Sequence, residues 1–366
     1  MTVEEESNVL PKFKAIDLVS FQLKLNAMLK QHLQNIDNIL HENTRFDWDN
    51  LMQPLEDMED ELERLWSPVA HMHSVVNSEP LRQCYEACLA KLSSYESTIG
   101  HNQRLYEAIK SIDHDKLNKT QQKVIQDSLL DFELSGVNLP AEKKPRFEQV
   151  QARLAELSNQ FENNVLDATH DFSLHVEDID KLAGLPEHTI QRARNLALEK
   201  GMTGYLLTLE FPCYHAIITH AEERQLRETF YHAYIPRASE IGPSAGCYDN
   251  GPVIYEIMKL RYEKAQILGF DNFADYSIAS KMAESSKQVL DFLHDLSTRA
   301  HRQAVIEFER LQTFAHKQCN IEVVQPWDIA FIAEKKRKDR FDLSQEALRS
   351  WFPLNKVMNG LFAIVT

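Results

Sequence analysis

The sequence predicts an all-α protein that contains one small β-hairpin. Apolar residues repeat at helical spacing along most of the chain. Glycine is scarce, at 10 of 366 residues, which favours long helices over architectures that depend on glycine-rich turns. A single stretch, at 204–212, instead alternates apolar and other residues with the period of a strand.

The helical pattern is clearest near residue 58. One helix face carries Leu51, Leu55, Met58, Leu62 and Leu65, and the opposite face carries Glu56, Asp57, Asp60 and Glu63. This arrangement is typical of a surface helix with one buried stripe. Comparable patterns predict helices at about 17–42, 49–66, 79–110, 119–134, 141–167, 186–201, 221–234, 251–268, 286–318 and 344–352.

The exception at 204–212 places Tyr205, Leu207, Leu209 and Phe211 on one face at a period of two. The segment 171–176 is its candidate antiparallel partner, so we expect one two-stranded element. The loop at 242–252 is dense in glycine, proline and asparagine. Its spacing does not match a nucleotide-binding fingerprint.

Charge limits the classes of partner. The chain has 40 basic and 55 acidic residues and a net charge of −15. Such a surface repels phosphate backbones and anionic lipid, so we expect neither nucleic acid nor membranes as partners. The acidic start of the chain has no apolar core of a secretory signal, and no apolar run reaches the length of a membrane span. Five cysteines at irregular spacing favour reduced thiols, so we expect a cytoplasmic protein.

The common zinc-binding motifs are missing from the sequence. It contains no H-E-x-x-H and no C-x-x-C. His71 and His73 are two residues apart, which on a helix turns them about 200° from each other, unsuited to one metal. His215 and His220 lie near Glu222 and Glu223 but span a strand-to-helix transition. We interpret these histidines as packing or surface residues.

Two further groups have a functional and a structural interpretation. Cys84 and Cys88 share a helix face and could hold a soft metal, but small buried thiols are the simpler interpretation. The basic run at 334–340 is interrupted by acidic residues. We interpret it as a solvated helix face, with a docking surface for acidic peptides as the alternative. No catalytic, cofactor-binding or metal-binding residue is therefore assigned.

The last residues form an apolar, helix-like face with no capping signal after it. It consists of Val357, Leu361, Phe362, Ile364 and Val365. From this pattern we expect a chain that is interrupted inside a helix.

Five stretches in register resemble the oligopeptidase A and thimet oligopeptidase family of zinc metallopeptidases. They are WDNL at 48–51 with QPL at 53–55 and LWSPVAH at 65–71; DFELSGVNLP at 131–140; LAELSNQF at 154–161 with NNVLDAT at 163–169; 261–270 with NFADYS at 272–277 and KMA at 281–283; and QPWDIA at 325–330. The order and spacing stay collinear with the family from near residue 10 to residue 366.

The resemblance implies an elongated body of two helical lobes around a channel that admits short peptides, as in zincin-type oligopeptidases. It also implies zinc in the complete enzyme, bound by a later H-E-x-x-H segment that these residues lack, so we expect this chain to bind no zinc. The implied division is an N-terminal lobe at 1–140 and 235–345, a segment at 141–234 that packs with the catalytic lobe, and the start of a catalytic-lobe segment at 346–366.

The chain departs from the family after its Trp-Asp motif. Phe331 and Ile332 stand where the family usually has two tyrosines. A buried apolar role would survive this change, but a hydroxyl contact would not.

Our leading hypothesis is the N-terminal part of a cytosolic zinc-dependent oligopeptidase, inactive alone, whose partners are short peptides and the missing C-terminal catalytic lobe. The alternative is a non-catalytic helical module that binds peptides or another protein, from a split or disrupted reading frame.

Overall fold

A computed structural model describes residue 13, residues 16–342, residue 348 and residues 350–365. The chain forms two compact units, one comprising residues 1–161 and 253–289 and the other residues 162–252 and 290–366. Helices dominate both units, and the described residues form one two-stranded sheet. The predicted all-α class with one small two-stranded antiparallel element is confirmed.

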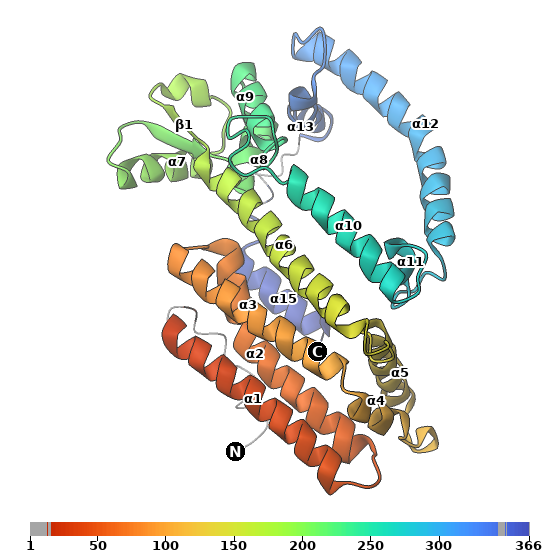
Figure 1. The fold of residues 1–366 in the computed structure, drawn as a ribbon. Coiled ribbons are helices and arrows are strands. Elements are labelled where there is room, and N and C mark those ends of the chain that lie inside the picture. Colours follow the sequence, from red (N-terminus) through yellow and green to blue (C-terminus); the bar gives the residue numbers. More distant parts are fainter. Residues whose placement is uncertain (1–12, 14–15, 343–347, 349, 366) are drawn as a thin grey trace. The chain divides into compact units, whose positions relative to one another are not determined.

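The first unit begins with three long helices that pack side by side (Figure 1). They are α1 (Leu18–Glu42), α2 (Gln53–Val75) and α3 (Glu79–Gly100). The unit also contains α4 (Gln103–Lys110), α5 (Lys119–Leu134), α10 (Gly251–Ile267), α11 (Phe273–Ile278) and the first part of α6 (Lys144–Asp171). A short π-helix, η2 (Trp48–Met52), precedes α2, and a 3-10 turn, η3 (His114–Lys116), precedes α5.

Helix boundaries in this unit follow from local capping. The side chain of Asn118 accepts a hydrogen bond from the backbone N–H of Gln121, and the side chain of Gln121 accepts one from the backbone N–H of Asn118. This capping box begins α5 at the predicted residue. Asn102 likewise accepts from Leu105 N–H and begins α4. The prediction of a single helix over 79–110 is therefore wrong, because this segment forms two helices, α3 and α4.

Three groups of buried side chains form the interior of the first unit. One lies among η2, α4 and α5, with Leu51, Leu105, Ile109 and Ile125 almost fully buried. A second joins α1, α2 and α3. The third packs the first part of α6 against α10. Arg146 and Arg153 of α6 add ion pairs to Glu263 and Glu256 of α10, at 2.6 and 2.7 Å.

The second unit contains the two-stranded sheet, whose strands are joined by a long connection that includes a helix. Strand β1 (Ser173–Val176) pairs antiparallel with β2 (Tyr205–Thr208), with Ser173 opposite Thr208 and Val176 opposite Tyr205. Helices α7 (Glu187–Glu199), α8 (Phe211–His220) and α9 (Arg224–Tyr234) share a core with it. The unit also contains α12 (Ser286–Gln318), α13 (Ile329–Phe341), α15 (Leu354–Val365), and the 3-10 turns η4 (Ile179–Leu182) and η5 (Pro326–Asp328).

The predicted pairing of the two strands is right, and the predicted length of the second strand is wrong. The second strand was expected over 204–212, but β2 ends at Thr208 and α8 begins at Phe211. Pro212 is in the first turn of α8, where proline is well tolerated. Helices α8 and α11 were not predicted as separate elements, and the helix face expected at 334–340 belongs to α13. The helix predicted at 344–352 lies mostly outside the described residues.

The apolar face predicted at 357–365 belongs to α15. Leu354, Leu361 and Phe362 are more than half exposed, and Ile364 is 84% exposed. No helix among the described residues is long and apolar enough to cross a bilayer. The lobe boundaries predicted from the family resemblance concern a complete enzyme and stay a prediction.

Candidate functional site

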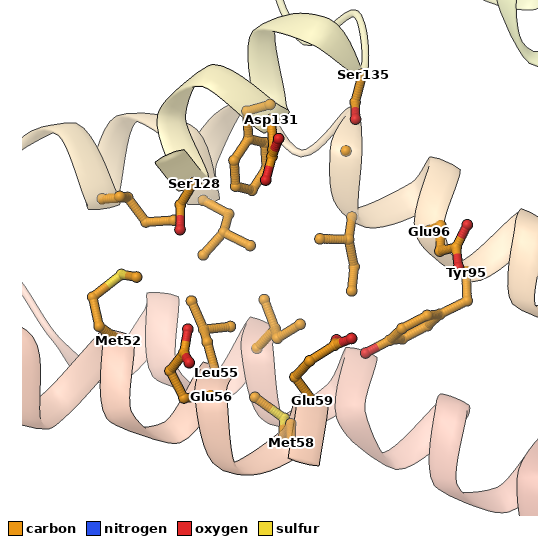
Figure 2. Close-up of a pocket in the computed structure, with 16 residues that line it drawn as sticks. Met52, Leu55, Glu56, Met58, Glu59, Tyr95, Glu96, Ser128, Asp131 and Ser135 are labelled. Atoms are coloured by element: carbon orange, nitrogen blue, oxygen red, sulfur yellow. The ribbon is translucent and has the colours of Figure 1, made fainter. Parts of the chain in front are cut away.

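The first unit contains an acidic pocket of about 480 Å3, shown in Figure 2. Helices α2, α3, α4 and α5 supply most of its walls. It is lined by Ile36, Met52, Leu55, Glu56, Met58, Glu59, Tyr95, Glu96, Ile99, Gly100, Leu105, Ile109, Ser128, Asp131, Phe132 and Ser135. Its apolar wall is part of the buried core, because Met52, Leu105 and Ile109 are almost inaccessible to solvent.

Four carboxylates lie around this apolar wall, from Glu56 and Glu59 of α2, Glu96 of α3 and Asp131 of α5 (Figure 2). None of the described lining residues is a lysine, arginine or histidine. The lining of the pocket therefore combines an excess of acidic groups with an apolar surface. Such a surface disfavours anions.

Burial and like charge raise the pKa values around this pocket. Burial and the neighbouring Glu59 raise the pKa of Glu96 above its ordinary value, and burial and Asp127 do the same for Asp131. Burial, with Glu59 and Glu96, raises the pKa of Tyr95 to about 12. The buried ring of His32 lies 3.5 Å from the Tyr95 hydroxyl and 3.2 Å from a Glu61 oxygen. The pocket has the character of a binding surface.

The second unit contains a different polar centre, and its two central side chains are buried. Asp328 is 0% exposed and Arg227 only 1%. An oxygen of Asp328 lies 2.9 Å from Nη2 of Arg227, and the other oxygen lies 2.7 Å from Nη2 of Arg224. The backbone N–H of Gln325 also donates to Asp328, at 3.0 Å. The two ion pairs connect η5 to α9.

The same cluster extends to α8 and α13. Arg227 donates to the carbonyl oxygen of Ala221 at 2.6 Å, and its guanidinium lies 4.0 Å from the ring centre of Phe331. Burial alone would raise the pKa of Asp328, but hydrogen bonds from Arg224, Gln325 and Arg227 hold it below its ordinary value. With no exposed atom, Asp328 cannot meet a substrate, so we assign the cluster a structural role.

The histidine pairs considered from sequence are held by separate packing contacts. His71 lies against Phe13, and His73 is buried and stacks on Tyr85 with ring centres 4.0 Å apart. His215 lies against Phe211 within α8, and His220 is the last residue of that helix. Glu223 accepts from the N–H of Gln225 at the start of α9, and Glu222 pairs with Lys335.

The two cysteines of α3 are buried, as predicted. Burial and the neighbouring Cys84 raise the pKa of the Cys88 thiol to about 12, so it stays protonated at neutral pH. All five cysteines are free.

The basic run at 334–340 lies on α13, and its interpretation as a solvated face is only partly right. Glu334 is buried and pairs with Arg337 at 2.7 Å, while Lys338 and Arg340 are exposed. Phe331 and Ile332 are buried, which matches the apolar role expected for them.

The described residues do not fit a catalytic zinc site. No group of three or more histidine, cysteine, aspartate or glutamate side chains in the described ranges could hold a metal ion. The pocket carboxylates lack the histidine or thiolate ligands that zinc prefers.

Sequence reasoning missed both polar centres. Asp328 was noticed only as part of the QPWDIA motif, and its partners Arg224 and Arg227 lie about a hundred residues earlier. The i, i+3 spacing of these arginines, which puts both on one face of a helix, was the one available signal.

Comparison with known proteins gives two family matches along the chain. The profile of the "Neurolysin/Thimet oligopeptidase, N-terminal domain" matches residues 23–144. The profile of "Peptidase family M3" matches residues 217–366.

Individual relatives match almost the whole chain. Oligopeptidase A of Escherichia coli is 45% identical over 360 residues, which cover 97% of this chain and 53% of the relative. Oligopeptidase A of Salmonella typhimurium is 43% identical with the same coverage. The probable cytosolic oligopeptidase A of Arabidopsis thaliana is 32% identical over 97% of this chain and 51% of its own length. The chain thus spans about half the length of these curated relatives.

A solved structure shares the fold. PZ peptidase A with inhibitor 2 superposes with a TM-score of 0.55 at 15% identity, covering 88% of this chain and 48% of that chain.

Proposed function

Because the chain is an oligopeptidase A-like member of peptidase family M3, we propose that it works as part of a zinc-dependent enzyme that cleaves short peptides. The observation that carries this proposal is the 45% identity to Escherichia coli oligopeptidase A across 97% of the chain. Identity at this level over one continuous alignment is hard to reconcile with an unrelated activity for the scaffold.

In this proposal the 366 residues supply structure, and the zinc ligands belong to the half of the relatives that this chain does not match. The sequence contains no H-E-x-x-H, which supports this division. Residues 1–140 and 235–345 would build one lobe, and 141–234 and 346–366 would pack with the catalytic part. The free thiols agree with a cytoplasmic location.

The exposed apolar face of α15 supports a contact with that catalytic part. A patch of this kind on a monomer is unusual and typically marks an interaction site. In the alternative function, a non-catalytic binding module, the same face would contact a different protein.

A complementation experiment tests the proposal. The chain is mixed with the part of Escherichia coli oligopeptidase A that it does not match, and cleavage of a fluorescence-quenched heptapeptide is measured. We expect no cleavage by the chain alone, and cleavage by the mixture that a zinc chelator abolishes. Leu361→Glu on the α15 face should reduce the restored rate by about tenfold or more, since a buried charge costs several kcal/mol without a partner.

The matched control is Asn359→Glu, which adds the same charge to α15 at a polar position. It should leave the restored rate within about twofold, the range expected for a surface change. Cleavage by the 366-residue chain alone that a chelator abolishes would overturn the proposed division. A mixture that neither associates nor cleaves would favour the binding module.

A further inference from the structure

The two edges of strand β1 differ in their partners. One edge pairs with β2 in the register that places Val176 opposite Tyr205. The carbonyl oxygen of Val176 points toward β2. A Cβ atom added at Gly204, the residue before β2, would lie 2.6 Å from this oxygen. Along a strand of an antiparallel pair, the backbone N–H and C=O groups of one residue face one edge of the strand, and those of the next residue face the other edge. Leu174 therefore also faces β2, and Ser173 and His175 present their backbone groups to the other edge.

The outer edge of β1 is open in the part of the chain that the structure describes. There the two-stranded sheet contains β1 and β2 alone, and no backbone hydrogen bond joins Ser173 or His175 to any other described element. Both residues are exposed. Unpaired strand edges of this kind are templates for the addition of another strand.

A cleft of about 700 Å3 lies along this strand. It is lined by Leu174, His175, Val176, Glu177, Asp178, Lys181, Glu223, Gln225, Leu226 and Thr229. The cleft thus runs between β1 with its following turn on one side and the first half of α9 on the other. Leu174, Val176 and Leu226 give it an apolar floor that is continuous with the core of the unit.

A strand edge facing a helix across a cleft suits one kind of ligand particularly well. An extended peptide can lie between them, exchange main-chain hydrogen bonds with the strand and place alternate side chains on the apolar floor. Ser173 and His175 together offer two N–H donors and two C=O acceptors for this purpose.

The charge of the cleft selects the peptide. Three of the lining residues, Glu177, Asp178 and Glu223, are acidic, and Lys181 is the one lysine or arginine among them. Asp178 and Glu223 are fixed in place because each accepts a backbone hydrogen bond, from Asp180 and from Gln225. A peptide with basic side chains would meet complementary charge, and an acidic peptide would be repelled.

We propose that the outer edge of β1 binds an extended peptide with basic side chains as a third, added strand. The biological source of that peptide rests on the proposed peptidase function. Binding itself needs neither zinc nor the catalytic part, so the two proposals fail separately.

The test measures binding by fluorescence anisotropy. The probes are a labelled hexapeptide of alternating lysine and valine and a matched peptide of alternating glutamate and valine. We expect saturable binding of the lysine peptide to the 366-residue chain, and binding of the glutamate peptide at least about tenfold weaker. Hydrogen exchange should show protection of the Ser173 and His175 amides when the lysine peptide is bound.

The variant His175→Pro removes one outward-facing N–H, at an edge where proline is tolerated. It should weaken binding by about tenfold, the effect of losing one or two main-chain bonds. The matched control His175→Ala also removes the side-chain bond to the Thr203 carbonyl but keeps the backbone group, and should bind within about twofold. A lysine–valine peptide with N-methyl groups on alternate amides should lose binding to the unaltered protein, which decides the matter if His175→Pro fails to fold.

Three results would overturn the inference: equal binding of the two peptides, unchanged binding by His175→Pro and by the N-methylated peptide, or protection that appears at the acidic pocket and not at β1. If the mixture in the complementation experiment does not cleave the heptapeptide but the lysine peptide still binds at β1, the proposed function is contradicted and this inference stands.

Discussion

Replacing Asp328 with alanine is expected to destabilise the second unit by about 3–5 kcal/mol, because it leaves the buried guanidinium of Arg227 without its charge partner. The free energy of unfolding of a domain is about 5–15 kcal/mol, so the unit should become marginal or unfold. Hydrogen exchange of the amides of α9 and α13 reports on this unit separately from the first.

Two variants define the origin of the effect. Asp339→Ala removes an exposed carboxylate from α13 and should change protection by no more than about 0.5 kcal/mol. In the double variant Arg227→Met with Asp328→Leu, both buried charges are absent, and much of the lost stability should return. Equal losses in the double variant and in Asp328→Ala would show that the charge pair is not the cause.

The same carboxylate predicts a pH dependence. The pKa of Asp328 lies below its ordinary value in the folded protein, so its contribution is fully present above the unfolded pKa of about 4. The contribution is lost as the pH falls through the lower, folded pKa. The stability difference between the native chain and Asp328→Asn should therefore shrink on acidification below about pH 4.

Gly184→Ala is expected to destabilise the second unit by about 2–4 kcal/mol, combining a strained backbone with a steric clash. Gly184 has a φ of +87°, and a Cβ there would lie 2.3 Å from the carbonyl oxygen of His220. A backbone atom at the end of α8 cannot rotate away as a side chain could. The measurement is hydrogen exchange of the amides of α8.

Gly201→Ala is the matched control. Its φ of +70° is also left-handed, but a Cβ there would meet nothing within 4 Å. It should lower the free energy of unfolding by about 1–2 kcal/mol, the cost of a left-handed backbone conformation for alanine. Equal effects at the two positions would mean that the contact with α8 is unimportant.

Local signals explain which elements were predictable from sequence. The helix predicted at 119–134 matches α5 at both ends because Asn118 and Gln121 form a capping box that is visible in the sequence. The helix predicted at 286–318 matches α12 because its apolar stripe repeats without interruption. The boundary between α3 and α4 was missed although Asn102 is a good N-cap, since the apolar pattern continues across it.

The remaining features depend on contacts between distant residues. The end of β2 is set by packing of α8 on the same core, which the alternating pattern through Phe211 conceals. Asp328 meets Arg227 across about a hundred residues, and the acidic pocket and the cleft along β1 each combine several elements. Periodicity reports on the face of one helix and carries no information about which faces meet.

We propose that these 366 residues provide the scaffold of a peptidase and none of its zinc ligands. Zinc content after equilibrium dialysis of the purified chain at micromolar zinc tests it most directly. We expect far less than one zinc per chain, with no change after treatment with a chelator. One tightly held zinc per chain, retained at nanomolar free metal, would contradict the account.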